Sequence, residues 1–247
     1  MAPPVLWQYN FSNFNEKARW ALDLKGVGHV RRSLLPGSPR AMRFSLRGTL
    51  PVLDLDGERI VDSTRIIEAL ERRHPDPPLY PEDPADRARA LEVEDFFDEE
   101  AGHELRRAAF YELRDEPDYV SAFLTTGRGS TARRLYRTFA LGPGMAWARR
   151  RYRIYPADVE AARAKLVEAL DRIVAEAGPT GYFVGSSFTV ADLTAAALLF
   201  PLAWPGELQY PYPRPRDWGA LRPLAEHPAV EWIAEIYRRH RGMSAEI

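Results

Sequence analysis

The 247-residue chain contains no cysteine. It can therefore form no disulfide, build no thiolate metal site and perform no thiol–disulfide exchange with a sulfur of its own. Its five histidines are scattered without the spacing of metal ligands, and no phosphate loop or dinucleotide fingerprint occurs. We therefore expect no metal site and no catalytic cysteine.

Long apolar runs and a large charge of one sign are also missing. No stretch reaches the length of a membrane span, and the first residues lack the charged segment and apolar core of a signal peptide. With 45% hydrophobic residues and a net charge of −1, the composition is that of an ordinary soluble protein. We therefore expect a cytoplasmic protein that binds neither membranes nor nucleic acids.

Two regions of different pattern divide a chain long enough for two small cores. In residues 1–80, strand-like apolar runs alternate with helical patterns, which indicates an α/β domain. A proline-rich, acidic segment over residues 74–84 indicates a linker. From residue 85 to residue 247 the pattern predicts an all-helical domain. Its expected helices cover residues 87–114, 131–155 with an interruption at Gly142-Pro143-Gly144, 157–177, 189–203 and 229–241.

The segment 49–70 combines a β-hairpin with the start of a helix. Pro51 heads an apolar run, and an Asp-Gly pair then predicts the hairpin turn. Because proline cannot donate to a sheet ladder, we expect Pro51 at the start or edge of its strand. Asp62 and Ser63 precede an apolar pattern at helical spacing, where Ser63 can cap the helix and its free N–H groups favour negative charge. This junction is either an ordinary helix cap or a binding site for an anion.

A second helix start is predicted far along the chain. Thr189 is a natural N-cap, and Asp192 three residues later completes a capping box. The apolar residues that follow predict a central helix, and such a cap contributes about 1 kcal/mol to its stability.

The order of these features resembles the glutathione transferase family across nearly the whole chain. The first eighty residues carry a strand, a polar turn, a KARWAL helix at residues 17–22, the apolar-Pro51 pair and the Asp62-Ser63 pair. Residues 182–193 resemble the capping motif of the family's helical domain. The resemblance implies an α/β plus all-α protein, in which an N-terminal thioredoxin-like domain precedes a C-terminal helical bundle domain.

The resemblance also implies an activity. In a cytoplasmic, homodimeric detoxification enzyme of this family, the thiolate of the co-substrate glutathione attacks a small hydrophobic electrophile held between the domains. Two alternatives stay open: a glutathione-dependent isomerase or dehalogenase, and a non-catalytic glutathione-binding or protein-interaction module on the same fold. The aromatic candidates for the electrophile pocket are Phe110, Tyr111, Trp147 and the loop 204–218.

Two hydroxyl groups compete to activate the thiol. Aligning Lys17 and Arg19 with the family's basic-x-Arg pair places Ser12 on the catalytic serine of theta- and zeta-like members. Tyr9 is the alternative, because tyrosine-type members carry that residue at the end of the first strand. In a third interpretation neither group donates, and Ser12 only caps the first helix. Asn13 departs from the family's usual Ser-Pro or Ser-Ser pair, and its amide is a further donor to sulfur.

A single hydroxyl donor is sufficient for this chemistry. The pKa of a free thiol is about 8.5, and it must fall by about 1.5 units for the thiol to be half ionised at neutral pH. This shift corresponds to about 2 kcal/mol. One hydrogen bond to a charged group supplies roughly 1.5–3 kcal/mol. A hydroxyl near a helix N-terminus therefore meets the requirement without a base of unusual pKa.

The resemblance assigns further residues to glutathione. Leu50 would make strand-like contacts to its cysteinyl backbone, and Pro51 would be the cis proline. Asp62 and Ser63 would hold the amine and carboxylate of its γ-glutamyl group. Arg40, with Arg43 as the alternative, would meet the glycine carboxylate.

Overall fold

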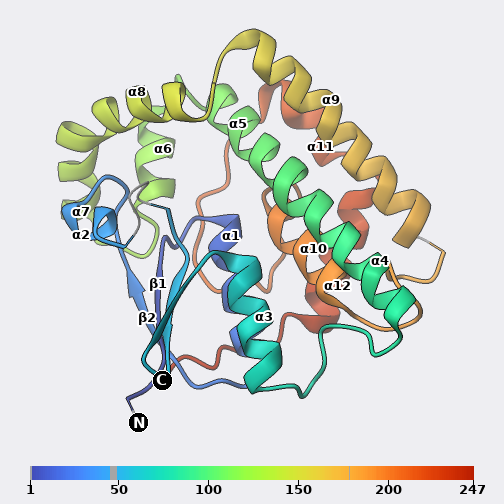
Figure 1. Ribbon diagram of the computed structural model, residues 1–247. Helices are drawn as coiled ribbons and strands as arrows, with labels where there is room; N and C mark the ends of the chain where they lie inside the picture. Colours follow the sequence, from blue (N-terminus) through green and yellow to red (C-terminus); the bar gives the residue numbers. More distant parts are fainter. Residues whose placement is uncertain (1, 45–48, 178) are drawn as a thin grey trace.

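The protein, described by a computed structural model over residues 2–44, 49–177 and 179–247, begins with a four-stranded mixed sheet (Figure 1). The strand order is β2-β1-β3-β4; β2 runs parallel to β1, while β3 is antiparallel to both of its neighbours. The strands are β1 (Val5–Gln8), β2 (Val30–Ser33), β3 (Val52–Leu55) and β4 (Glu58–Val61). This confirms the predicted hairpin, and Pro51 directly precedes β3 as expected.

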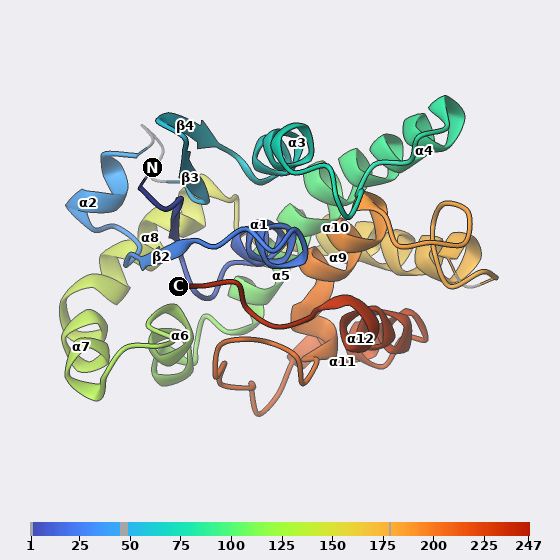
Figure 2. The same cartoon turned by 90° about the horizontal axis from the view of Figure 1, so that it is seen from below.

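Two helices pack against each other on one side of this sheet (Figures 1 and 2). They are α1 (Asn13–Leu24) and α3 (Ser63–Arg73), both predicted. The short helix α2 (Pro39–Met42) lies on the other side of the strands in Figure 2. The sheet and these helices form the expected α/β part of the fold.

The remainder of the described chain is helical, which confirms the predicted fold class. One long helical run comprises α4 (Pro84–Asp95), the π-helical turn η1 (Phe96–Ala101) and α5 (Gly102–Glu112), close to the single helix expected there. No helix of the described residues is long and apolar enough to cross a bilayer. The other elements are α6 (Pro117–Leu124), α7 (Ser130–Leu135), η2 (Tyr136–Ala140), α8 (Leu141–Arg151), α9 (Pro156–Arg172), η3 (Ile173–Ala177), α10 (Val190–Ala203), η4 (Gly219–Leu221), α11 (Arg222–Ala225) and α12 (Ala229–His240).

One expectation for this region was wrong, and one helix was not predicted. The Gly142-Pro143-Gly144 sequence does not interrupt a helix, because it lies in the first turn of α8, where a proline removes only an N–H that has no intrahelical partner. The irregular stretch is the π-helical η2 just before it, and the helical run continues through it from α7 to α8. Helix α6 was not expected, although Pro117 occupies a position that favours a helix start.

Helix α10 is the central element of the molecule. It is apolar on all sides and almost completely buried, packing against α1 of the sheet domain and against α4 and α12. Its start confirms the predicted capping box: Asp192 Oδ2 accepts from the Thr189 N–H at 2.8 Å, and Asp192 Oδ1 accepts from the Phe183 N–H at 2.9 Å. This cap therefore fixes the end of the helix on which the two parts of the fold meet.

A buried ion-pair cluster joins α1 to the C-terminal segment. The carboxylate of Glu16 contacts Arg19 at 2.8 Å and Arg241 at 2.6 Å, and all three side chains are fully buried. Arg241 also contacts Asp23 at 3.0 Å. Beyond it, the last residues bond to His29 beside β2, with the Ile247 N–H donating to its carbonyl at 3.0 Å. The C-terminal segment is therefore fastened to the sheet domain.

Removing the charge of Glu16 will destabilise the protein strongly. Glu16→Gln leaves two buried arginines without their shared carboxylate, and we expect a loss of about 3–5 kcal/mol at pH 7. Burial alone would raise the pKa of Glu16, but the charges and hydrogen bonds of Arg241 and Arg19 lower it to about 2. The contribution is therefore complete above the unfolded pKa of about 4.3 and disappears as pH falls towards 2.

Urea unfolding at pH 7 and at pH 3 measures this contribution. The difference between wild type and Glu16→Gln should shrink at the lower pH, whereas Glu231→Gln, on the exposed face of α12, should match wild type at both. A Glu16→Gln protein as stable as wild type at pH 7 would contradict this account.

Candidate functional site

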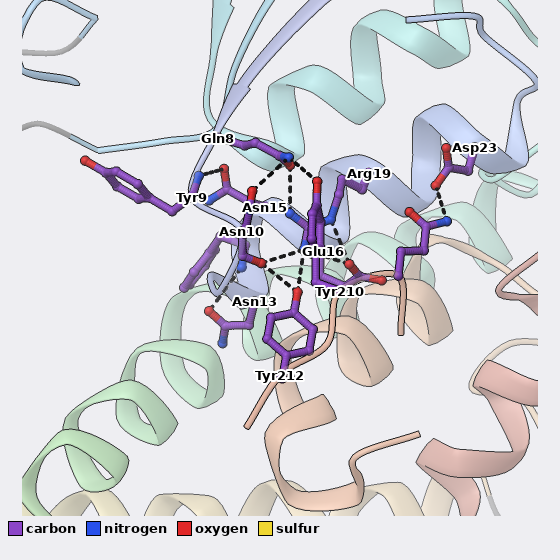
Figure 3. Close-up of polar contacts among 12 residues, drawn as sticks. Gln8, Tyr9, Asn10, Asn13, Asn15, Glu16, Arg19, Asp23, Tyr210 and Tyr212 are labelled. Atoms are coloured by element: carbon purple, nitrogen blue, oxygen red, sulfur yellow. Dashed lines mark hydrogen bonds and ion pairs between the residues drawn. The ribbon is translucent and has the colours of Figure 1, made fainter. Parts of the chain in front are cut away.

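A polar network holds the turn between β1 and α1 in place (Figure 3). Arg19 donates to the Gln8 side chain at 2.7 Å and to the Asn10 carbonyl at 3.2 Å. The Tyr212 hydroxyl donates to the same carbonyl at 2.6 Å. The backbone just before Ser12 is therefore fixed by α1 and by the loop that follows α10.

Ser12 stands at the N-terminus of α1. It is the N-cap residue in an extended conformation, yet within the described part of the chain its side chain makes no capping hydrogen bond. The interpretation of Ser12 as a side-chain cap is therefore not supported by this geometry. The residue is half-buried and lines a largely apolar pocket.

This pocket lies between the turn, α5, α6 and the segment that begins at the end of α10. Apart from Ser12, Asn13 and Arg106, apolar and aromatic side chains form its wall. The full lining is Phe11, Ser12, Asn13, Leu105, Arg106, Ala109, Phe110, Leu113, Tyr119, Val120, Phe123, Pro201, Trp204 and Trp218.

The predicted aromatic residues divide into two groups. Phe110 and both ends of the loop, Trp204 and Trp218, line the pocket. Tyr111 instead lies under the guanidinium of Arg114, and Trp147 is half exposed on α8. Helical spacing alone could not separate these groups, because it does not show which face of a helix meets a cavity.

Tyr9 and Asn13 occupy different surroundings from Ser12. The Tyr9 ring stacks on Phe11 and points away from the polar network in Figure 3. Burial, followed by the nearby hydroxyls of Tyr152 and Tyr136, raises the pKa of Tyr9 well above its usual range, so the phenol stays protonated at neutral pH. The Asn13 amide donates to the Leu198 carbonyl of α10 at 2.9 Å, which gives it a structural role at the domain junction.

Asn15 connects the turn to the strand edge at Leu50. Its side chain accepts from the Tyr9 N–H at 3.1 Å and donates to the Leu50 carbonyl at 3.1 Å. The peptide bond between Leu50 and Pro51 is cis, as the sequence resemblance implied. The Pro51 carbonyl in turn accepts from the Asp62 N–H at 3.3 Å. The structure thus brings Leu50, Pro51 and Asp62 together.

The start of α3 differs in one detail from the prediction. Asp62, not Ser63, is the capping residue: its Oδ1 accepts from the N–H groups of Thr64 at 3.0 Å and Arg65 at 3.3 Å. Its backbone has a φ of +91°, which turns the chain sharply into the helix. Ser63 is the first helical residue, and its hydroxyl is buried with no hydrogen-bond partner among the described residues. An unpartnered buried hydroxyl costs about 1–3 kcal/mol, so Ser63 is placed to gain from a ligand.

A buried lysine next to this junction was missed by sequence reasoning. Lys17 Nζ contacts Asp98 at 2.6 Å, Glu94 at 2.9 Å and the Thr64 hydroxyl at 2.7 Å, thereby joining α1, α3 and the α4–η1 run. The available signal was its position on the face of α1 that also carries Phe14 and must be buried. The acidic partners could not be found, because they lie about eighty positions away in the sequence.

Arg40 and Arg43 lie exposed on and beside α2. The guanidinium of Arg40 lies over the Trp7 ring, 5.1 Å from its centroid. Within the described residues, the Arg40 side chain contacts Trp7 and makes no contact with Ser12, Leu50 or Ser63.

A mixed four-stranded sheet with a cis proline before β3, joined to a helical bundle through α10, defines a class of two-domain proteins with a thioredoxin-like first domain. Residues 6–78 match the family model for the glutathione S-transferase N-terminal domain, and residues 156–231 match the model for its C-terminal domain. The two models together cover more than half of the chain, which belongs to the glutathione S-transferase family.

Known relatives agree with this assignment. The chain is 37% identical over 94 residues to a probable maleylacetoacetate isomerase of Caenorhabditis elegans, covering 36% of this chain and 44% of the relative. The chain thus matches less than half the length of such curated relatives. A glutathione S-transferase structure from Rhodospirillum rubrum aligns with a TM-score of 0.66 at 21% identity, covering 96% of this chain and 89% of that one. A theta class glutathione S-transferase from Xanthomonas axonopodis pv. citri, with glutathione bound, aligns with a TM-score of 0.60 at 19% identity, covering 99% and 100%.

Loss of the Asn15 side chain should loosen the site and lower stability. Asn15→Ala leaves the Tyr9 N–H and the Leu50 carbonyl without their buried partner, and we expect a loss of about 2–4 kcal/mol. Ser12→Ala, in the same turn, removes a hydroxyl that makes no capping bond and should stay within about 0.5 kcal/mol of wild type. Urea unfolding of the three proteins decides this, and equal losses in both variants would contradict the roles given to these side chains.

Proposed function

We propose that the protein is a glutathione transferase that directs the thiolate of bound glutathione at a small hydrophobic electrophile. The observation that carries this proposal is the position of Ser12. Ser12 stands at the N-terminus of α1, its hydroxyl makes no capping bond, and the residue lines an otherwise largely apolar pocket. The proposed hydrogen-bond donor to the thiolate, Ser12, therefore borders the proposed electrophile site.

Glutathione fits the groups that lie between α1, β3 and α3. Leu50 and Pro51 offer a strand edge to its cysteinyl backbone, while Asp62 and the N-terminus of α3 suit its γ-glutamyl amine and carboxylate. The unpartnered hydroxyl of Ser63 supports a ligand oxygen at this junction. Arg40, exposed and cationic, would hold the glycine carboxylate.

The reaction needs only electrostatic help from the protein. Ser12 donates a hydrogen bond to the sulfur and, with the N-terminal N–H groups of α1, favours the thiolate over the thiol. The thiol proton passes to solvent, the sulfur forms a bond to the electrophilic carbon, and the leaving group departs with its electron pair. The apolar wall keeps water from competing at that carbon.

A second candidate is a glutathione-dependent isomerase. It is favoured by the relatives named maleylacetoacetate isomerase, which include proteins of Caenorhabditis elegans and Pseudomonas aeruginosa. Reversible addition of the same thiolate to a double bond would use the same Ser12 donor. The site geometry therefore serves either reaction, and the electrophile decides between them.

We further infer, from family membership, that the protein acts in the cytoplasm as a homodimeric detoxification enzyme. We propose that residues 1–80 form the glutathione-binding domain. Residues 85–247 then form the domain that contributes the electrophile pocket. The segment 74–83 between α3 and α4 supports this boundary, since it contains neither helix nor strand.

Replacing Ser12 should raise the pKa of the bound thiol. In Ser12→Ala we expect it to rise by about 1–2 units towards the free value near 8.5, and kcat/KM for an activated aryl halide at pH 7 to fall by about 10–100-fold. Thiolate absorbance as a function of pH, recorded on the glutathione complex, measures the pKa directly.

Tyr9→Phe is the matched control for this experiment. It should leave both the thiol pKa and kcat/KM within about twofold of wild type, because the proposal gives the phenol no part in the chemistry. Activity that is lost in Tyr9→Phe and kept in Ser12→Ala would transfer the role to Tyr9.

A further inference from the structure

Arg106 is the basic residue in the lining of a pocket whose other residues are largely apolar. It projects from α5 and lines the pocket together with Ser12. Its guanidinium lies over the Tyr152 ring, 4.1 Å from the centroid, and 5.7 Å from the centroid of Phe14. Because planar guanidinium groups stack favourably on aromatic faces, these rings hold the charge in a defined place.

Arg106 is half-buried, and it differs from the fully buried basic side chains of the protein. Lys17, Arg19 and Arg241 each contact carboxylates at 2.6–3.0 Å. Among the described residues, no carboxylate forms an ion pair with Arg106, and its Nε is buried without a hydrogen-bond partner. A guanidinium stays charged in proteins, and taking part of it out of water without an ionic partner is costly.

The surroundings of Arg106 increase the demand for an anion. Burial lowers its pKa, as do the positive charges of Arg151 and Arg107, while Tyr152 and Glu104 act in the opposite direction. Glu104, on the same helix, is already paired with Arg107.

We propose that Arg106 determines specificity by binding a carboxylate of the electrophile, whose apolar body fills the rest of the pocket. The substrate class is then an apolar acid with a reactive carbon, rather than a neutral hydrophobic electrophile. Phe110, Phe123 and Trp218 provide the apolar contacts, and Ser12 marks the side from which the sulfur attacks. The inference rests on the proposed function and names the substrate class of the same site.

A matched pair of model electrophiles isolates the charge. With 4-(bromomethyl)benzoate, the glutathione sulfur bonds to the benzylic carbon, bromide leaves with the bonding electrons, and the thiol proton goes to solvent. The product, S-(4-carboxybenzyl)glutathione, keeps the carboxylate. The methyl ester of the benzoate group has the same reactive carbon and similar shape but no charge at this end.

Calorimetric titration with the two conjugates tests the proposal without requiring turnover. Wild type should bind S-(4-carboxybenzyl)glutathione about tenfold or more tightly than its benzoate methyl ester, as expected for a hydrogen-bonded charge pair. Arg106→Gln should abolish this preference while leaving the Kd for the ester and for reduced glutathione within about twofold. Arg106→Lys, which keeps the charge but not the planar fork, should retain part of the preference. The exposed Arg149→Gln is the control and should behave as wild type.

The outcomes separate this proposal from the proposed function. Equal binding of acid and ester by wild type would overturn the role of Arg106, and so would an equal loss of both conjugates and of reduced glutathione in folded Arg106→Gln. If wild type bound no glutathione, the proposed function would fail. Titration with 4-methylbenzoate would then test the arginine alone: binding by wild type but not by Arg106→Gln would uphold it, and no binding would overturn it.

Discussion

The position of the candidate catalytic turn depends on one buried carboxylate. Glu16 lies between Arg19 of its own helix and Arg241, which is 225 positions away in the sequence. Arg19 also donates a hydrogen bond to the carbonyl of Asn10, two residues before Ser12. The C-terminal segment, the first helix and the turn that carries Ser12 are therefore one connected unit, and a buried ion pair of this kind is costly to break.

The two proposed sites, for glutathione and for the electrophile, share a boundary at Ser12. On one side of Ser12, the cis Leu50–Pro51 edge and the start of α3 offer polar groups that suit a peptide with charged ends. On the other side, α5, α6 and the segment after α10 form an apolar wall in which Arg106 is the charged group. Because the wall excludes water, hydrogen bonds and charges that meet at this boundary act more strongly than they would in solvent.

Features with local causes were predictable from the sequence. The Asp-Gly hairpin, the start of α10 at Thr189 and the position of Pro51 before its strand each follow from short-range rules, and the structure has all three. Where two local signals competed, the prediction failed: Asp62 rather than Ser63 caps α3. The Gly142-Pro143-Gly144 sequence appeared to break a helix because its position within the first turn of α8 was not known. The partners of Glu16 and Lys17, and the isolation of Arg106, were beyond prediction, because charge pairing between distant segments is set only when they pack together.

The central claim, that the polar groups beside Ser12 form a glutathione site, is tested most directly by calorimetric titration with reduced glutathione. The account predicts one site per chain with a Kd in the micromolar to millimolar range, and weaker binding by about tenfold in Ser63→Ala, whose hydroxyl would lose its ligand oxygen. No binding at several millimolar glutathione, by protein shown to be folded, would contradict this claim. The protein would then use the fold of this family for an interaction other than glutathione binding.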